Sequence, residues 1–406
     1  MQSRLKYFVV TSSTILTLLL LIGSVAGQGA SSQDDTYKHI GVFTDVVSRI
    51  KTEYVEEPDM KSVTLGALNG MLEAIDPFAS YLNADQYKDY LKNKDVKRAN
   101  VGLLLSKKFG YVGVVGVVPG SPAAKAGFTT GDMIESIKDI ATRDMPLAYA
   151  DLLLRGDPGT EVELSVVRVS KPEPTTVKLT RANFTVPPVE ERMLANQVAY
   201  IKPQTLSMAQ VKETASAIQK AQKDGAQKLL IDLRNTSVGD PDEGIAFANL
   251  FLNKGLITYL QGQRVSRQNF DADPAKAITT LPTVVLTNRG TADGAEIAAA
   301  ALADNNRAQL VGEPTYGEAS MRKAITMDDG SAIILSVAKY YGPDGKAIQD
   351  NRVTPKNQVL QAEPQVDVDD NGEPLTDTDA PQAQQQKKLE DDSMVKKALE
   401  ILGGKV

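Results

Sequence analysis

The stretch PGSPAAKAG at residues 119–127, followed by GDMIESI at residues 131–137, specifies a short capped helix and then a strand. Ser121 supplies a side-chain N-cap, and Pro122 has the fixed φ of a first helical residue. Gly127 suits the left-handed conformation that ends many helices. We therefore expect a very short helix from Pro122 to Ala126. The alternation of apolar residues in the second stretch predicts a strand.

The sequence on both sides completes a small domain. Leu147 to Leu154 predicts a helix, and Val162, Leu164 and Val166 lie on one face of a further strand. Residues 97–183 together resemble a PDZ domain, and the two stretches quoted above match the usual pattern of that family closely. The resemblance implies a domain that adds a peptide as an extra strand and holds its C-terminal carboxylate in a loop of backbone N–H groups.

The peptide-binding loop implied by this resemblance is Asn100-Val101-Gly102-Leu103. Leucines at 103–105 and 152–154 are expected to line a pocket for an apolar terminal side chain. The expected partners are therefore peptides or protein C-termini. A PDZ domain used only for packing or as a gate stays an alternative, because a fold alone does not establish a function.

The segments that flank this domain have different patterns. Residues 35–95 predict a small helical bundle, whose second helix ends at Asp76-Pro77. Residues 184–362 predict a larger α/β unit with a parallel core, in which strands at Lys228–Asp232 and Thr283–Leu286 are each followed by a helix. The apolar residues at helical spacing in the predicted bundle are Val42, Val46, Val47, Ile50, Leu65, Leu68, Met71, Leu72 and Ile75.

Composition excludes several classes of function. The chain has 406 residues, 42% hydrophobic, no cysteine and a single histidine, His39, expected on an exposed helix. A thiol nucleophile, a disulfide, a thiolate zinc site and a Ser-His-Asp triad are therefore excluded, and we expect no metal site and no cofactor. The net charge of −6 comes from residues 363–406, where an acidic tail is predicted to be disordered before a short terminal helix. Without a basic stripe, nucleic-acid binding is not expected.

The first 27 residues are typical of an export signal. Arg4 and Lys6 precede an uncharged run from Tyr7 to Gly27, which contains a small-x-small cleavage site. We expect an exported protein, periplasmic or otherwise extracytoplasmic. The run is also long enough to span a bilayer, so a cleaved signal peptide and a retained membrane anchor both stay open, as does homo-oligomerisation.

Several further motifs occur in the order typical of one family. The chain resembles the carboxyl-terminal processing (tail-specific) serine peptidases from about residue 38 to 360. The resemblance implies an α/β multidomain fold with an N-terminal helical segment, a PDZ domain and a crotonase-like α/β protease core. The matching motifs are GM at 70–71, DPFASYL at 76–82, DLRN at 232–235, GEPTYG at 312–317 and PDGKAIQ at 343–349.

The catalytic positions of that family carry other residues in this chain. The family uses a Ser-Lys dyad, with the serine in a motif resembling NxxSASASE and the lysine after GEPTFG. The resemblance places Asp293 at the nucleophile position and Glu318 at the lysine position. Its oxyanion segment DLRxNPGG corresponds to a stretch that keeps one glycine, Gly239, after Val238. Ser320 and Lys323 are expected on the strand that carries Glu318, so they do not replace the dyad.

We therefore expect a homologue that binds peptides as a scaffold or regulator and has lost proteolysis. An active endopeptidase with a non-standard site is the competing hypothesis. Asp293 and Glu296 have the spacing of a helix capping box, which gives the carboxylate at 293 a structural explanation. The alternatives are that Asp293 and Glu318 share a proton, as in aspartic proteases, or bind a divalent ion.

Overall fold

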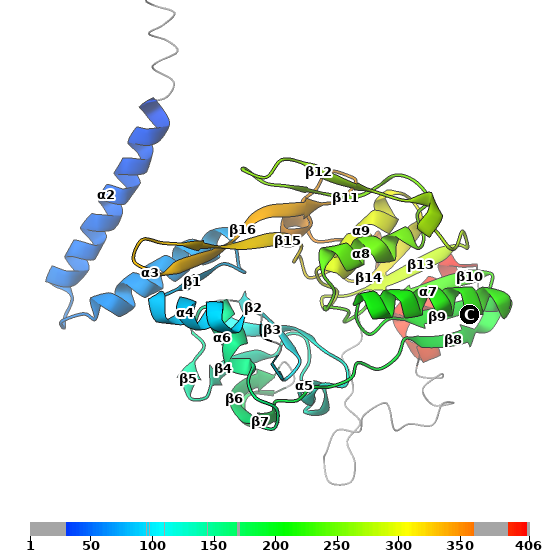
Figure 1. Cartoon of the computed structure of the whole chain (residues 1–406), viewed down its shortest axis with the longest axis horizontal. Helices are drawn as coiled ribbons and strands as arrows, with labels where there is room; N and C mark the ends of the chain where they lie inside the picture. The colour runs from blue at the N-terminus through cyan, green and yellow to red at the C-terminus, as the bar shows by residue number, and fades with distance from the viewer. Residues whose placement is uncertain are drawn as a thin grey trace, which may run out of the picture. The chain divides into compact units, whose positions relative to one another are not determined.

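The computed structural model describes residues 30–94, 96, 98–108, 110–143, 145–168, 171–360 and 389–403 (Figure 1). The chain divides into two compact units, residues 1–67 and 68–406. The expected export signal at 1–27 and most of the expected acidic tail lie outside the described residues. None of the helices in the described ranges has the length and hydropathy needed to cross a bilayer.

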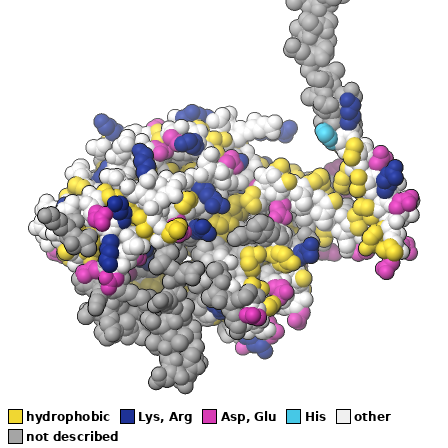
Figure 2. Space-filling model, turned by 180° about the vertical axis from the view of Figure 1, so that it is seen from behind, with side chains coloured by type: hydrophobic (Ala, Val, Ile, Leu, Met, Phe, Trp, Pro, Cys, Tyr) yellow, Lys and Arg dark blue, Asp and Glu magenta, His cyan; other side chains and the backbone are white. Residues whose placement is uncertain are grey.

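The N-terminal helices do not form the packed bundle that the sequence predicts. Helix α2 (Ala30–Glu53) contains the exposed His39, as expected, and α3 (Met60–Ile75) ends directly before Asp76. Helix α3 has no buried residue. None of the predicted apolar positions on the two helices is buried, and the relative accessibility reaches 62% for Val42 and 69% for Ile75. Figure 2 shows hydrophobic side chains in yellow on the surface of this part of the chain. The helical periodicity of apolar residues predicted the helices, but it does not predict which elements pack against their apolar faces.

The segment 98–183 has the predicted strands and helices. Its sheet has the order β2-β3-β4-β6-β7, with β5 paired to β4, and β2 lies at an edge. Ser121 caps α5 by accepting the Ala124 N–H at 3.1 Å, and Gly127 has φ +69°. Val162, Leu164 and Val166 are buried, as predicted. The elements are β2 (Leu103–Lys108), β3 (Tyr111–Val117), α5 (Pro122–Lys125), β4 (Met133–Ile137), β5 (Ile140–Ala141), α6 (Leu147–Leu154), β6 (Glu161–Arg168) and β7 (Lys171–Thr180).

A six-stranded sheet forms the centre of the C-terminal region, with the order β17-β14-β13-β10-β9-β8. All neighbouring pairs are parallel except β8 and β9, which confirms the predicted parallel core. The strands are β8 (Glu190–Leu194), β9 (Val198–Lys202), β10 (Lys228–Asp232), β13 (Thr283–Thr287), β14 (Ala308–Gly312) and β17 (Asn357–Gln358). The helices are α7 (Met208–Lys223), α8 (Pro241–Asn249) and α9 (Gly294–Asp304), with 3₁₀ turns at Ala195–Gln197 and Pro274–Lys276.

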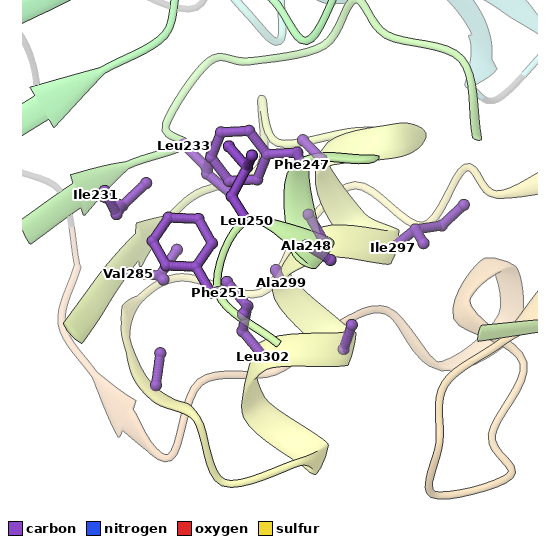
Figure 3. Packing of buried hydrophobic residues seen from close by; sticks show 14 of the residues in the cluster. Ile231, Leu233, Phe247, Ala248, Leu250, Phe251, Val285, Ile297, Ala299 and Leu302 are labelled. Carbon is purple, nitrogen blue, oxygen red and sulfur yellow. The ribbon is translucent and has the colours of Figure 1, made fainter. Parts of the chain in front are cut away.

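Both faces of this parallel sheet are covered. Alternate residues such as Ile231 and Val285 pack against α7, α8 and α9, and Figure 3 shows Phe247 and Phe251 beside them. The other alternate residues, such as Leu230 and Val284, pack against the C-terminal helix α12 (Ser393–Ile401). The short terminal helix expected from the sequence is therefore part of the folded core.

A second sheet includes part of the motif DPFASYL at residues 76–82, within the unit formed by residues 68–406. Strand β1 (Ser80–Leu82) pairs antiparallel with β16 (Ala332–Tyr341), so residues 35–95 are not all helical. Asp76 accepts the Phe78 N–H at 3.0 Å and the Ser336 N–H at 2.9 Å, which fixes the motif to β16. The other elements near this sheet are α4 (Ala84–Asn93), β11 (Leu256–Gln261), β12 (Gln268–Asp271), β15 (Ser320–Thr326) and α10 (Ile348–Asn351).

Candidate functional site

Asp293 lies at a sharp turn between strand β13 and helix α9. It is the N-cap of α9 and has φ +51° and ψ −120°, a conformation that costs a residue with a side chain about 1–3 kcal/mol. The turn is closely packed, because a Cβ on Gly294 would lie 2.6 Å from the Gly239 carbonyl oxygen. Strained turns of this kind occur where a fold holds one side chain at a functional position.

Glu296 links this turn to the segment before β15. Asp293 and Glu296 form the predicted capping box, in which the Asp293 N–H donates to Glu296 Oε2 at 3.1 Å. The fully buried Glu296 carboxylate also accepts the Thr315 hydroxyl and the N–H groups of Gly317 and Glu318, both at 2.7 Å. Glu296 therefore holds the positions 293 and 318 close together. The sequence predicted only its capping role.

The site concentrates carboxyl groups that resist ionisation. Burial raises the pKa of Glu296 to about 7 and raises the pKa of Glu318 above its usual value. Burial, with the charge of Glu318 added, also raises the pKa of Asp293 well above its usual value. The Arg322 guanidinium forms an ion pair with Glu318 and opposes the rise in the pKa of Glu318 and of Asp293. The structure thus places Glu318 close enough to Asp293 for its charge to act on the Asp293 carboxyl group.

The carboxyl groups of Asp293, Glu296 and Glu318 form an acidic cluster. Aromatic residues connect this acidic cluster to the motif DPFASYL and to the PDZ segment. The guanidinium carbon of Arg322 lies 4.6 Å from the centre of the Phe78 ring. The Phe78 and Tyr316 rings meet edge to face, with centroids 6.0 Å apart. Burial raises the pKa of Tyr316 to about 12, and the nearby side chain of Ser106 in β2 acts in the opposite direction. Strand β2 therefore lies near the segment that carries Glu318.

The hydroxyl groups of Thr291 and Ser320 have structural partners. Thr291 is fully buried and donates to the Leu233 carbonyl oxygen at 2.8 Å. Ser320 is hydrogen-bonded to Ser336 on the neighbouring strand, at 2.9 Å. Strand β15 begins at Ser320, so Glu318 precedes this strand by two residues and the sequence-based assignment of Glu318 to it is wrong.

Gly239 lies in the loop between β10 and α8, next to the start of α9. It has φ +154°, and its carbonyl oxygen accepts the Gly294 N–H at 3.0 Å. The same loop contacts the PDZ segment, because a Cβ on Gly116 of β3 would lie 1.9 Å from Ser237 Oγ. The loop is thus in contact with the start of α9 on one side and with strand β3 on the other. Its role as an oxyanion region stays a prediction.

The predicted peptide-binding loop leads into the edge strand β2. Gly102 has φ +81°, and its N–H donates to Asn100 Oδ1 at 2.8 Å. The Asn100 N–H donates to the Ala182 carbonyl oxygen at 3.4 Å, so two of the predicted donors already have acceptors. Val101 and Leu103 direct their side chains into the core of the PDZ segment, with 0% and 8% exposure. Binding by this loop stays a prediction.

Within the described residues, no group of three or more His, Cys, Asp or Glu side chains is arranged to hold a metal ion. The acidic cluster around Asp293 consists of carboxyl groups that favour protonation and includes one arginine. This chemistry does not suit a divalent cation, which binds ionised carboxylates.

Comparisons with known proteins match both parts of this architecture. A model of peptidase family S41 matches residues 197–359, and a PDZ domain model matches residues 113–168. The carboxy-terminal processing protease CtpA of Bacillus subtilis (strain 168) is 30% identical over 361 residues, which cover 87% of this chain and 77% of that protein. The carboxy-terminal-processing protease of Bartonella bacilliformis is 30% identical over 374 residues, 90% of this chain and 84% of that protein. The solved photosystem II D1 C-terminal processing protease aligns with a TM-score of 0.64 and 25% identity, over 78% of this chain and 92% of that structure.

Proposed function

The chain belongs to the PDZ-containing carboxy-terminal processing proteases of peptidase family S41, and on that premise we propose that it binds peptides or protein C-termini without cleaving them. It would act as a scaffold or regulator. The observation that carries the proposal is the side chain at the strained start of α9, which is Asp293 where the family resemblance implies a serine.

The surroundings of Asp293 support a loss of serine-type catalysis. A serine needs a neighbouring base, and the resemblance implies a lysine where this chain has Glu318. Attack by the Asp293 carboxylate on a peptide bond would produce a mixed anhydride, which is less stable than the amide it replaces. The nearby hydroxyl of Thr291 is buried and donates to a backbone carbonyl.

The PDZ segment supports the binding half of the proposal. Strand β2 lies at a sheet edge, where an extended peptide can add as a further strand. The loop before it keeps a glycine, Gly102, in the left-handed conformation that a tight turn requires. Ser106 of the same strand lies near Tyr316, so a peptide on β2 would lie near the acidic cluster.

The raised pKa values of Asp293 and Glu318 favour a second candidate, an endopeptidase in which these two acids share a proton. This candidate requires both carboxyls to act on one water molecule. Hydrolysis of an unfolded protein that disappears in Asp293→Asn and in Glu318→Gln would establish it. No hydrolysis by the unaltered protein would exclude it.

Calorimetric titration of the full chain tests the binding function. We expect a peptide that ends in an apolar residue to bind with a dissociation constant of about 1 μM, and its C-terminal amide to bind at least about 10-fold more weakly. Gly102→Ala should abolish binding, since a Cβ there would lie 2.1 Å from Ser121 Cβ. Gly159→Ala is the matched control, because Gly159 has φ +83° but open space around it. Equal affinity for the acid and the amide, or no binding, would refute the proposed function.

Export rests on residues 1–27 alone, and we propose an extracytoplasmic location on the basis of that sequence. Fractionation of expressing cells, with Arg4 and Lys6 both changed to Glu as the comparison, tests it. Equal cytoplasmic retention of both proteins would contradict the proposal.

A further inference from the structure

Helix α6 ends next to the predicted carboxylate-binding loop. The N–H of Gly156, two residues after the last residue of α6, donates to the carbonyl oxygen of Ala99 at 3.0 Å. The last carbonyl groups of a helix carry a partial negative charge. A peptide carboxylate bound by the loop would therefore approach a helix end of the same sign, which by itself weakens its binding.

Arg181 covers this helix end. Its Nε donates to the Leu154 carbonyl oxygen at 3.2 Å, and its Nη2 donates to the Leu153 carbonyl oxygen at 2.8 Å. Its Nη1 donates to Thr160 Oγ1 at 3.1 Å and to the Glu161 carbonyl oxygen at 2.8 Å. These contacts use four of the five N–H groups that a guanidinium offers.

The charge of Arg181 has no counter-ion in the part of the chain that the structure describes. Its acceptors are three backbone carbonyls and one hydroxyl, all neutral. The residue is only 3% exposed, and burial lowers its pKa, although an arginine stays protonated. Buried cations are normally paired with an anion, because removing a charge from water is costly.

Arg181 also lies against the backbone that leads into the loop. A Cβ on Gly156 would lie 2.8 Å from Arg181 Cδ and 3.0 Å from its Nε. The backbone N–H of Gly156 is in turn hydrogen-bonded to Ala99. Ala182, the residue after Arg181, forms an antiparallel β-bridge with Asn100. The unpaired guanidinium is thus connected by direct contacts on two sides to the residues that begin the loop.

We propose that Arg181 makes this site selective for a free C-terminal carboxylate, by reversing the sign of the charge at the end of α6. The inference rests on the proposed peptide-binding function and names the residue that gives it acid selectivity. Arg181 acts through the electrostatic field at the loop, while backbone N–H groups of the loop contact the carboxylate.

The test measures the ratio of the dissociation constants of the amide and free-acid forms of one peptide, with the full chain. In Arg181→Gln, which keeps hydrogen-bond donors but loses the charge, we expect free-acid affinity to fall about 10-fold and amide affinity to change less than about 2-fold. Arg181→Lys, which keeps the charge, should retain most of the preference for the acid.

Arg168 provides the matched control. Its guanidinium also donates to carbonyl oxygens at the end of a helix, those of Ala126 and Gly127, but it has a carboxylate, Asp132, at 4.0 Å. Arg168→Gln should lower stability without changing the ratio.

A folded Arg181→Gln protein with the unaltered ratio would overturn the inference and leave Arg181 as a helix cap. Should Arg181→Gln fail to fold, Arg181→Lys decides, because loss of the acid preference there overturns the role of charge and its retention supports it. An unaltered protein without acid preference would instead refute the proposed function itself.

Discussion

Asp392 connects the C-terminal helix to the loop beside Asp293, and its removal gives a quantitative prediction. Its Oδ1 accepts the N–H groups of Met394 and Val395 at 2.8 and 3.2 Å, which caps α12. Its Oδ2 lies 2.6 Å from Nη1 of Arg234, whose side chain is 7% exposed. One carboxylate therefore holds both the helix and the arginine.

The expected cost of Asp392→Ala follows from these contacts. Loss of an N-cap costs about 1 kcal/mol, and loss of a hydrogen bond to a charged group costs about 1.5–3 kcal/mol. Arg234 keeps its ion pair with Asp232 at 2.7 Å, so the guanidinium is not left without an anion. We expect the free energy of unfolding to fall by about 2.5–4 kcal/mol in total. Asp392→Asn, which keeps the cap, should lose about 1.5–3 kcal/mol.

Urea unfolding, with amide hydrogen exchange of α12 and residues 233–239, measures these losses. Asp391→Ala is the control, because Asp391 pairs at 3.1 Å with Lys396 while the two side chains are 63% and 41% exposed. An exposed pair of this kind contributes at most about 1 kcal/mol. Equal losses in Asp392→Ala and Asp391→Ala, or faster exchange confined to α12, would refute the link between α12 and the loop.

Three further predictions concern the acidic cluster. The unaltered protein should not cleave an unfolded substrate or react with hydroxyl-directed acylating probes, and hydrolysis lost on Thr291→Val would contradict this. Asp293→Ser combined with Glu318→Lys should give only weak peptidase activity, about 10²–10³-fold below an ordinary family member, because residues 236–238 alter the oxyanion loop; full activity would show that reasoning to be wrong. Because burial raises the pKa of Glu296 from 4.5 to about 7, its protonation favours the folded state below pH 4.5, and this contribution, about 3 kcal/mol, is lost as the pH rises through 7. Urea unfolding between pH 5 and 8 should show a flatter pH dependence in Glu296→Gln, and an unchanged slope would contradict the assignment.

Local signals in the sequence predicted the elements whose ends and faces they determine. Ser121 and Pro122 specify the start of α5 through their own backbone chemistry, and alternation in β6 reports burial on one face. The parallel core followed from continuous apolar runs such as Lys228–Asp232. These features depend on residues that are near each other in the chain.

Pairings between distant residues were not predictable in the same way. Ser80 pairs with Ile334 across the sheet, and nothing around Ser80 specifies that partner. The Glu296 carboxylate accepts four hydrogen bonds, and three of the donors lie in a segment about 20 residues away. The spacing of Asp293 and Glu296 in the sequence therefore predicted the helix cap but not these three contacts. For α2, the apolar periodicity predicted the helix correctly but the bundle wrongly, because periodicity does not identify a partner surface.

The position of α12 has a practical consequence for protein production. The segment that matches the peptidase family model ends at residue 359, whereas Met394, Val395 and Ala398 cover one face of the central sheet. A shortened protein that stops at residue 359 would leave Leu230 and Val284 without that cover. Such an exposed apolar face promotes self-association, so a boundary drawn from sequence similarity alone would give an aggregation-prone product.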